Sequence, residues 1–158
     1  MSTGPSRTVR RTTVLTAPAD VVWHAVRQPA TLVHVAAPLL RMPELEGRTA
    51  PWTPGDSVTT RLRLLGVVPL HRHTVTIELV DDARHTLQTD ERGGPLTVWR
   101  HRITVEPVDP GSCRYTDEVL VGAGRLTGAA HLLVRVFYRW RHLRWRRLAP
   151  VLAATALP

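Results

Sequence analysis

The stretches WRHRITV (Trp99–Val105) and YTDEVLV (Tyr115–Val121) decide the fold of this chain. Each alternates apolar with polar residues, which is the pattern of a β-strand with one buried face. A turn-rich segment joins the two, and one long amphipathic stretch follows from about Arg125 to Leu152. A strand hairpin that leads into a single long C-terminal helix predicts a curved sheet that wraps around the helix, with a cavity between the two.

The rest of the chain supplies the other strands of an antiparallel sheet. Short alternating segments are separated by turns that are rich in glycine, proline and aspartate. Pro18 and Asp20 are typical of a helix start, and Pro29 and Pro38 of helix ends, so two short helices are expected after the first strand. The predicted strands are residues 8–16, 41–47, 57–65, 70–80, 84–91, 97–106 and 113–121, and the predicted short helices are 17–28 and 30–37.

These elements define an α+β fold with a seven-stranded curved antiparallel sheet. We predict one ligand-binding domain over residues 1–158, with residues 1–6 and 153–158 flexible. The chain is 43% hydrophobic, as expected for a globular protein, and its formal net charge is +8. All 21 basic residues are arginine, and Cys113 is the only cysteine. No signal-peptide pattern follows the basic residues 1–11, so we expect a cytoplasmic protein.

The short turns allow the strand register to be predicted. We centred the three hairpins on Asp82, Gly94 and Asp109, which keeps the sum of paired positions nearly constant. Apolar residues then gather on one face, which we take to be the inward face. The predicted rows across this face are Val75, Thr89, Trp99 and Val119; then Ile77, Leu87, His101 and Asp117; then Leu79, His85, Ile103 and Tyr115.

The C-terminal helix is predicted to bury its aliphatic face. At 100° per residue that face holds Leu126, Ala129, Ala130, Leu133, Val136, Phe137, Trp140, Leu148 and Val151. The opposite face is expected to hold His131, Arg135, Arg139, His142 and Arg146. Arg144 falls within the aliphatic face, and Arg141 lies on its flank.

The order of strand, two short helices, six strands and long helix resembles the START-like (SRPBCC) superfamily. This helix-grip fold is shared by Bet v 1-like proteins, lipid-transfer START domains and polyketide cyclases/dehydrases. The motifs that resemble the superfamily are TAPADVVW (Thr16–Trp23), WRHRI (Trp99–Ile103), YTDEV (Tyr115–Val119) and FYRWRH (Phe137–His142). Ile103 stands where many relatives carry an aromatic residue, which implies a wider pocket floor. No catalytic constellation of a cyclase matches clearly, so none is carried over.

His101, Asp117 and Tyr115 are the candidate catalytic or orienting residues. A carboxylate beside an imidazole fixes the orientation of the ring, and such a pair binds a ligand hydroxyl or carbonyl, or moves a proton. The alternative is a satisfied polar pair that braces the sheet.

Two other groups carry open alternatives. His71 and His73, with Glu91 opposite His73, are either metal ligands or histidines at the barrel rim, and no third ligand is fixed by local spacing, so no metal is predicted. Arg144 binds an anionic ligand group at the cavity mouth, or it reaches solvent or an acid. No cofactor is predicted, because glycine-rich phosphate-binding motifs are absent.

We therefore expect a carrier or sensor of a hydrophobic small molecule, such as a lipid or polyketide. The alternative is a cyclase/aromatase-type enzyme that uses the same cavity, and a second alternative is a peripheral protein whose Arg-rich helix binds an anionic membrane surface. Nucleic acid is not predicted, because no binding motif accompanies the charge. The predicted ligand-binding residues are Leu62, Leu64, Val75, Ile77, Leu87, Trp99, His101, Ile103, Tyr115, Asp117, Val119, Leu133, Phe137, Trp140 and Arg144.

Overall fold

One curved antiparallel sheet and one long helix form the framework of the protein. The computed structural model describes residues 4–156. The sheet has seven strands in the order β1-β7-β6-β5-β4-β3-β2. The strands are β1 (Ser6–Leu15), β2 (Leu40–Arg41), β3 (Ser57–Leu64), β4 (Val68–Asp81), β5 (Thr86–Gly93), β6 (Val98–Asp109) and β7 (Ser112–Gly122). The helices are α1 (Ala19–Val26), α2 (Pro29–Ala36) and α3 (Thr127–Ala156), with short 3-10 helices η1 (Pro43–Leu45) and η2 (Gly124–Leu126).

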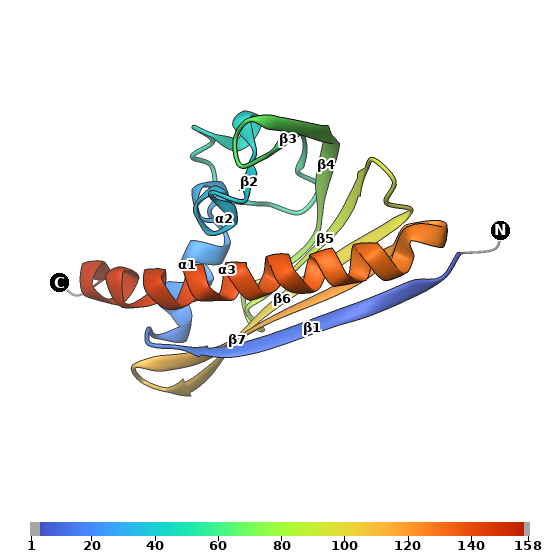
Figure 1. The fold of residues 1–158 in the computed structure, drawn as a ribbon. Coiled ribbons are helices and arrows are strands. Elements are labelled where there is room, and N and C mark those ends of the chain that lie inside the picture. The colour runs from blue at the N-terminus through green and yellow to red at the C-terminus, as the bar shows by residue number, and fades with distance from the viewer. Residues whose placement is uncertain (1–3, 157–158) are drawn as a thin grey trace.

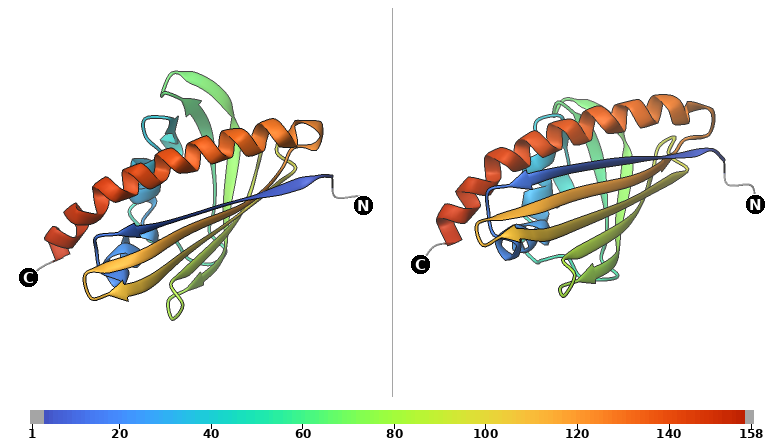
Figure 2. Two further views of the ribbon diagram at one scale, coloured as in Figure 1. Left: turned by 60° about the horizontal axis from the view of Figure 1, so that its bottom comes forward. Right: turned by 90° about the horizontal axis from the view of Figure 1, so that it is seen from below.

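Helix α3 lies along the open side of the curved sheet (Figure 1). The first and last long strands, β1 and β7, are neighbours, so the chain closes on itself beside α3. Helices α1 and α2 pack near the C-terminal half of α3, as two further views show (Figure 2). The sheet, the long helix and the two short helices thus surround one interior space. This is the predicted helix-grip architecture, and the prediction is confirmed.

The element boundaries differ from the predictions mainly at the second strand. Residues 41–47 were expected to form one strand, but β2 has only two residues and is followed by η1. Pro43 explains the break, because proline cannot donate a ladder hydrogen bond. Strand β1 begins at Ser6 and α3 extends to Ala156, so regular structure covers parts of the termini that we expected to be flexible. Residues 1–3 and 157–158 lie outside the described range. Within residues 4–156, no helix combines the length and apolar composition that crossing a membrane requires.

The predicted strand register is wrong by two residues, and the predicted inward face is correct except near the end of β4. Leu79 was expected to face inward but is exposed, because a bulge between Ile77 and Leu79 turns Val80 toward the core instead. His101 pairs with Val119 across β6 and β7, and Asp117 pairs with Ile103. The hairpins are centred about one residue further along the chain than expected, which shifts the paired positions by two residues. A shift of two residues preserves the alternation of faces, whereas a shift of one would have inverted it.

The predicted inward face of α3 is only partly correct: Ala130, Leu133 and Phe137 line the cavity as expected, but the centre of the buried face lies elsewhere on the helix. The helix buries Thr127, Val134, Tyr138, Arg141, His142, Trp145 and Ala149. Several aliphatic residues of the predicted face are exposed instead, including Leu133 and Val136. The helix is therefore turned by about a third of a rotation, so that polar and aromatic side chains face the sheet. The reason is on the sheet, where buried Asp117 provides a partner for Arg141 and His142.

Two valines on α3 test this orientation of the helix. Val134 is 4% exposed and Val136 is 58% exposed. Val134→Ala removes two buried methyl groups and is expected to lower the free energy of unfolding by about 2 kcal/mol. Val136→Ala, the matched control, is expected to change it by less than about 0.5 kcal/mol. Urea unfolding followed by circular dichroism measures both, and the opposite order would contradict the observed orientation.

Candidate ligand-binding cavity and its buried polar cluster

A cavity of about 610 Å³ lies between the concave face of the sheet and α3. Its walls come from α2, from β3 to β6 and from α3, and they are mostly aliphatic and aromatic. The volume lies within the range of pockets that bind drug-sized molecules. The large aliphatic lining residues that are also solvent-exposed, Leu64, Leu70, Leu126, Leu133 and Val136, lie on β3, β4, η2 and α3. The mouth of the cavity therefore lies between α3 and the β3–β4 hairpin.

A buried carboxylate on β7 joins the sheet to α3. Asp117 Oδ1 accepts hydrogen bonds from His101 Nε2 at 2.6 Å and from Tyr115 Oη at 3.0 Å. Asp117 Oδ2 accepts a hydrogen bond from His142 Nε2 at 3.0 Å and lies 3.6 Å from Arg141 Nε. Because an ionised carboxylate only accepts, both imidazoles present an N–H to it. All five side chains are at most 5% exposed.

The electrostatics of this cluster favour an ionised Asp117. Burial opposes the charge, but the charge of Arg141 and the hydrogen bonds from His101 and His142 outweigh burial, and the pKa of Asp117 falls well below its usual value. Burial likewise opposes the charge of Arg141, yet Tyr115 and Asp117 hold its pKa above the usual value. Burial raises the pKa of Tyr115, so this phenol remains a hydrogen-bond donor. The cluster is a buried ion pair in which Asp117 accepts three hydrogen bonds, while Arg141 Nε and His142 Nδ1 have no partner within the described residues.

A second carboxylate lies in the cavity wall beside the first cluster. Glu91 Oε2 accepts a hydrogen bond from His73 Nε2 at 2.7 Å, and Glu91 Oε1 accepts one from Thr89 at 2.7 Å. Glu91 Oε1 also lies 3.9 Å from His101 Nδ1. Burial raises the pKa of Glu91, but the hydrogen bond and charge of His73 outweigh burial, and the net shift is downward. His101 therefore lies between two carboxylates, one at each ring nitrogen.

Several buried polar atoms around the cavity have no hydrogen-bond partner within the described part of the chain. They are His71 Nε2, His73 Nδ1, Trp99 Nε1, Arg141 Nε and Trp145 Nε1, and all five residues line the cavity. Such atoms are uncommon in protein interiors, because an unpaired buried polar group costs about 1–3 kcal/mol. Polar side chains therefore stand among the apolar residues that line the cavity, but these five atoms are themselves covered by neighbouring protein atoms.

The predicted ligand-binding residues divide into two groups. The first group lines the cavity and consists of Leu62, Leu64, Val75, Ile77, Leu87, Trp99, His101, Ile103, Leu133 and Phe137. The second group lies outside the cavity wall and consists of Tyr115, Asp117, Val119, Trp140 and Arg144.

The second group has structural contacts. Tyr115 and Asp117 lie behind His101 and position it from the sheet. Val119 belongs to a small core with Val134 and Tyr138. Trp140 Nε1 donates to the carbonyl of Ala37. Arg144 donates to the carbonyl of His34 at 3.2 Å, near the end of α2. Arg144 therefore caps a helix end in this structure, where backbone carbonyls lack partners.

The cluster residues on α3 were missed by sequence reasoning. His142 was assigned to the solvent face and Arg141 to a flank, and Tyr138 was not considered. Their spacing contains a usable signal, because Val134, Tyr138, Arg141 and Trp145 follow each other at intervals of four, three and four residues. That interval marks one helix face, and only the polarity of Arg141 argued against burying it.

The described residues contain neither a cluster of side chains suited to bind a metal ion nor a reactive thiol. No cluster of three or more histidine, cysteine, aspartate or glutamate side chains has the geometry to hold a metal ion between residues 4 and 156. The carboxylate of Glu91 instead accepts hydrogen bonds from His73 and Thr89. Cys113 is buried, and burial raises the pKa of its thiol to about 11, which disfavours the nucleophilic thiolate.

Comparison with known protein families assigns the sequence to one family. A family model described as a domain of unknown function (DUF8410) matches residues 13–149. The chain belongs to this family. No curated protein matches the sequence.

Solved structures share the fold at low sequence identity. A point mutant of norcoclaurine synthase from Thalictrum flavum has a TM-score of 0.69 at 13% identity, covering 99% of this chain and 100% of that one. Ara h 8.0201 has a TM-score of 0.69 at 15% identity, covering 93% and 99%. An aromatase/cyclase from a Streptomyces species has a TM-score of 0.58 at 14% identity, covering 90% of each chain. The fold is thus the Bet v 1-like, SRPBCC helix-grip fold, as predicted.

The ionised carboxylate of Asp117 is expected to make the folding stability of the protein decrease at acid pH. Asp117→Asn leaves Arg141 without its counter-charge and is expected to lower the free energy of unfolding by about 3 kcal/mol at pH 7. Because the folded-state pKa of Asp117 lies below the unfolded value of about 3.9, its stabilisation is complete above about pH 4 and declines as pH falls toward the folded value. The advantage of wild type over the variant is expected to be equal at pH 7 and 5 and about 1 kcal/mol smaller at pH 3.

Urea unfolding of both proteins at pH 7, 5 and 3 measures this difference. Asp90→Asn is the matched control, because Asp90 pairs with Arg92 on the outer face of the sheet. The control is expected to change the free energy of unfolding by less than about 0.5 kcal/mol at each pH. An advantage of wild type over Asp117→Asn that stays constant down to pH 3 would contradict a lowered pKa.

Proposed function

We propose that this protein binds a hydrophobic small molecule in the cavity between the sheet and α3, as a carrier or sensor. The aliphatic and aromatic walls would bury the apolar body of the ligand, which is the main source of affinity for such molecules. A few polar side chains in the lining, namely His73, Glu91 and His101, would fix its orientation. A lipid or polyketide with one polar end matches this arrangement.

The cavity of about 610 Å³, with its mostly aliphatic and aromatic lining, is the observation that carries the proposal. Such walls favour a ligand with a large apolar body, and a strongly polar ligand would not suit them. His73, Glu91 and His101 also line the cavity, so one polar end of the ligand would have polar side chains nearby.

Fold neighbours lend general support to a small-molecule role. One neighbouring structure is norcoclaurine synthase in complex with dopamine and hydroxybenzaldehyde, and another is an aromatase/cyclase. At these low identities the neighbours share only the fold, and unrelated functions occur on one fold. The proposal therefore depends on the cavity and its polar wall.

Native mass spectrometry of the protein purified from its own host tests the proposal. The expected result is a co-purifying apolar molecule at about one per chain, identified by its released mass. The matched control is the same preparation after organic extraction and refolding, which is expected to lose the mass shift and to regain it with the extract. Protein that is empty from the host and unshifted by a lipid and polyketide library would contradict a carrier or sensor.

A second candidate function is a cyclase/aromatase-type enzyme. The observation that favours it is His101, which lines the cavity with Asp117 at one ring nitrogen and Glu91 at the other. An imidazole oriented by a carboxylate is a common proton-transfer group. In that case the cavity would position a reactive chain, and His101 would transfer a proton to or from it.

His101→Gln distinguishes the two functions. Glutamine retains an N–H donor for Asp117 but does not transfer protons in this pH range. A carrier is expected to keep its ligand affinity within about threefold, whereas an enzyme is expected to lose turnover by about 10²-fold or more. Ligand titration and product formation from candidate polyketide chains measure the two. His24→Gln, at an exposed histidine on α1, is the matched control and is expected to change neither.

A further inference from the structure

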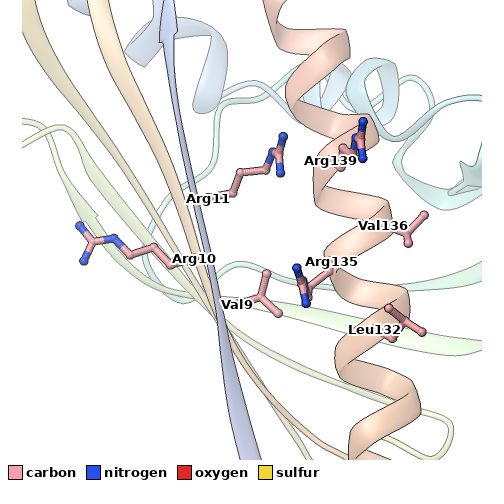
Figure 3. Close-up of a pocket in the computed structure, with 7 residues that line it drawn as sticks. All are labelled: Val9, Arg10, Arg11, Leu132, Arg135, Val136 and Arg139. Atoms are coloured by element: carbon pink, nitrogen blue, oxygen red, sulfur yellow. The ribbon is translucent and has the colours of Figure 1, made fainter.

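A cationic groove of about 330 Å³ lies outside the cavity, between β1 and α3. Its lining consists of Val9, Arg10, Arg11, Leu132, Arg135, Val136 and Arg139. Figure 3 shows Arg11 and Arg135 extending into the gap between the strand and the helix, whereas Arg10 points away across the other side of β1. Four of the seven lining residues are arginines and none is acidic. The groove therefore concentrates positive charge.

The arginines in the groove form no strong ion pair that would stabilise the fold. Arg10 lies 3.8 Å from Glu118 in an exposed pair, and such pairs are weak. Among residues 4–156, no acidic side chain lies within 4.0 Å of the guanidinium groups of Arg11, Arg135 or Arg139.

Neighbouring positions on the same helix make the contrast clear. Arg146 Nε donates to Thr13 Oγ1 at 2.7 Å, and His131 Nε2 lies 3.4 Å from the carbonyl oxygen of Thr8. These contacts attach α3 to β1 on both sides of the groove. Arg135 and Arg139, between them, remain exposed and available.

An exposed apolar ridge runs beside the groove on α3. Leu132, Leu133 and Val136 are each at least 58% exposed. Val136 lines both the groove and the cavity, and Leu133 lines the cavity. Across the cavity mouth, the β3–β4 hairpin also exposes aliphatic side chains, namely Leu64, Leu65, Val67, Val68 and Leu70. Exposed apolar side chains gathered in this way are typical of an interaction surface.

We propose that this surface docks on an anionic phospholipid bilayer. Arg11, Arg135 and Arg139 bind headgroup phosphates, and Leu132, Leu133 and Val136 enter the interface between headgroups and acyl chains. The mouth of the cavity then faces the membrane, and an apolar ligand passes between bilayer and cavity without crossing water. The docking surface depends on its own charge and apolar side chains, whichever ligand the cavity holds.

The charge of the groove favours a bilayer over a second copy of the chain. A symmetric dimer through this face would bring identical patches together, and unpaired arginines would then face one another. An anionic bilayer supplies the opposite charge and an apolar phase together. The exposed ridge of α3 matches both parts of that partner.

Vesicle flotation tests the proposal with the full chain and no added ligand. The probes are phosphatidylcholine vesicles with and without 30% phosphatidylglycerol, at 50 and 500 mM NaCl. We expect binding to the anionic vesicles at low salt and a loss of about tenfold or more in 500 mM NaCl or without phosphatidylglycerol. Equal binding to the two vesicle types, or none at low salt, would overturn the proposal.

Charge variants locate the contact. Arg135→Gln with Arg139→Gln is expected to weaken binding to anionic vesicles at least tenfold. Arg100→Gln with Arg114→Gln removes the same charge from the outer face of the sheet and is expected to weaken it less than threefold. Equal losses in the two double variants would mean that net charge, and not the groove, causes binding. A stable dimer that blocks vesicle binding would also overturn the proposal.

A site-specific probe tests the insertion of α3. Cys113 is buried and resists labelling, so a cysteine introduced at Leu133 takes an environment-sensitive dye selectively. On anionic vesicles we expect a blue shift and loss of quenching by iodide for Leu133→Cys, and neither for Glu106→Cys on the outer sheet face. Vesicle binding without a shift at position 133 would overturn the proposed orientation.

Discussion

The carboxylate of Asp117 is the interaction on which the arrangement of this protein depends. It is buried on β7, accepts three hydrogen bonds and lies close to the guanidinium of Arg141. An unpaired buried charge would be costly, so the fold must bring donors to it from outside the strand. Those donors come from β6 and from α3. The carboxylate therefore fixes both the height and the rotation of the long helix against the sheet.

The orientation of α3 explains both candidate surfaces. Because Tyr138, Arg141 and Trp145 face inward, the aliphatic residues about a third of a turn away cannot all be buried. Part of that aliphatic face lines the cavity, and part of it faces solvent beside the groove. The same rotation places Tyr138, Arg141 and Trp145 in the cavity lining. The polar wall of the cavity and the exposed apolar ridge are thus two consequences of one helix rotation.

Local patterns predicted the order of the elements and the inward face of the sheet. The alternation in β4, β6 and β7 depends only on residues two apart, so it is visible in the sequence. The register depended on turn centres, and each hairpin is centred about one residue later than predicted, which moves the pairing by two residues. The contact between His101 and Asp117 is consequently diagonal across the strands and not directly opposite.

The sequence by itself determined the class of fold, the candidate residues His73, Glu91, His101 and Asp117, and the excess of positive charge. These follow from composition and short-range periodicity, which a single strand or helix expresses alone. Only the tertiary structure decided which face of α3 is buried, that Glu91 lies between His73 and His101, and that three unpaired arginines meet beside an apolar ridge. Those outcomes depend on contacts between residues far apart in the sequence. A buried carboxylate is paired with donors and cations that the fold brings to it, and the hydrophobic pattern of one helix does not contain that information.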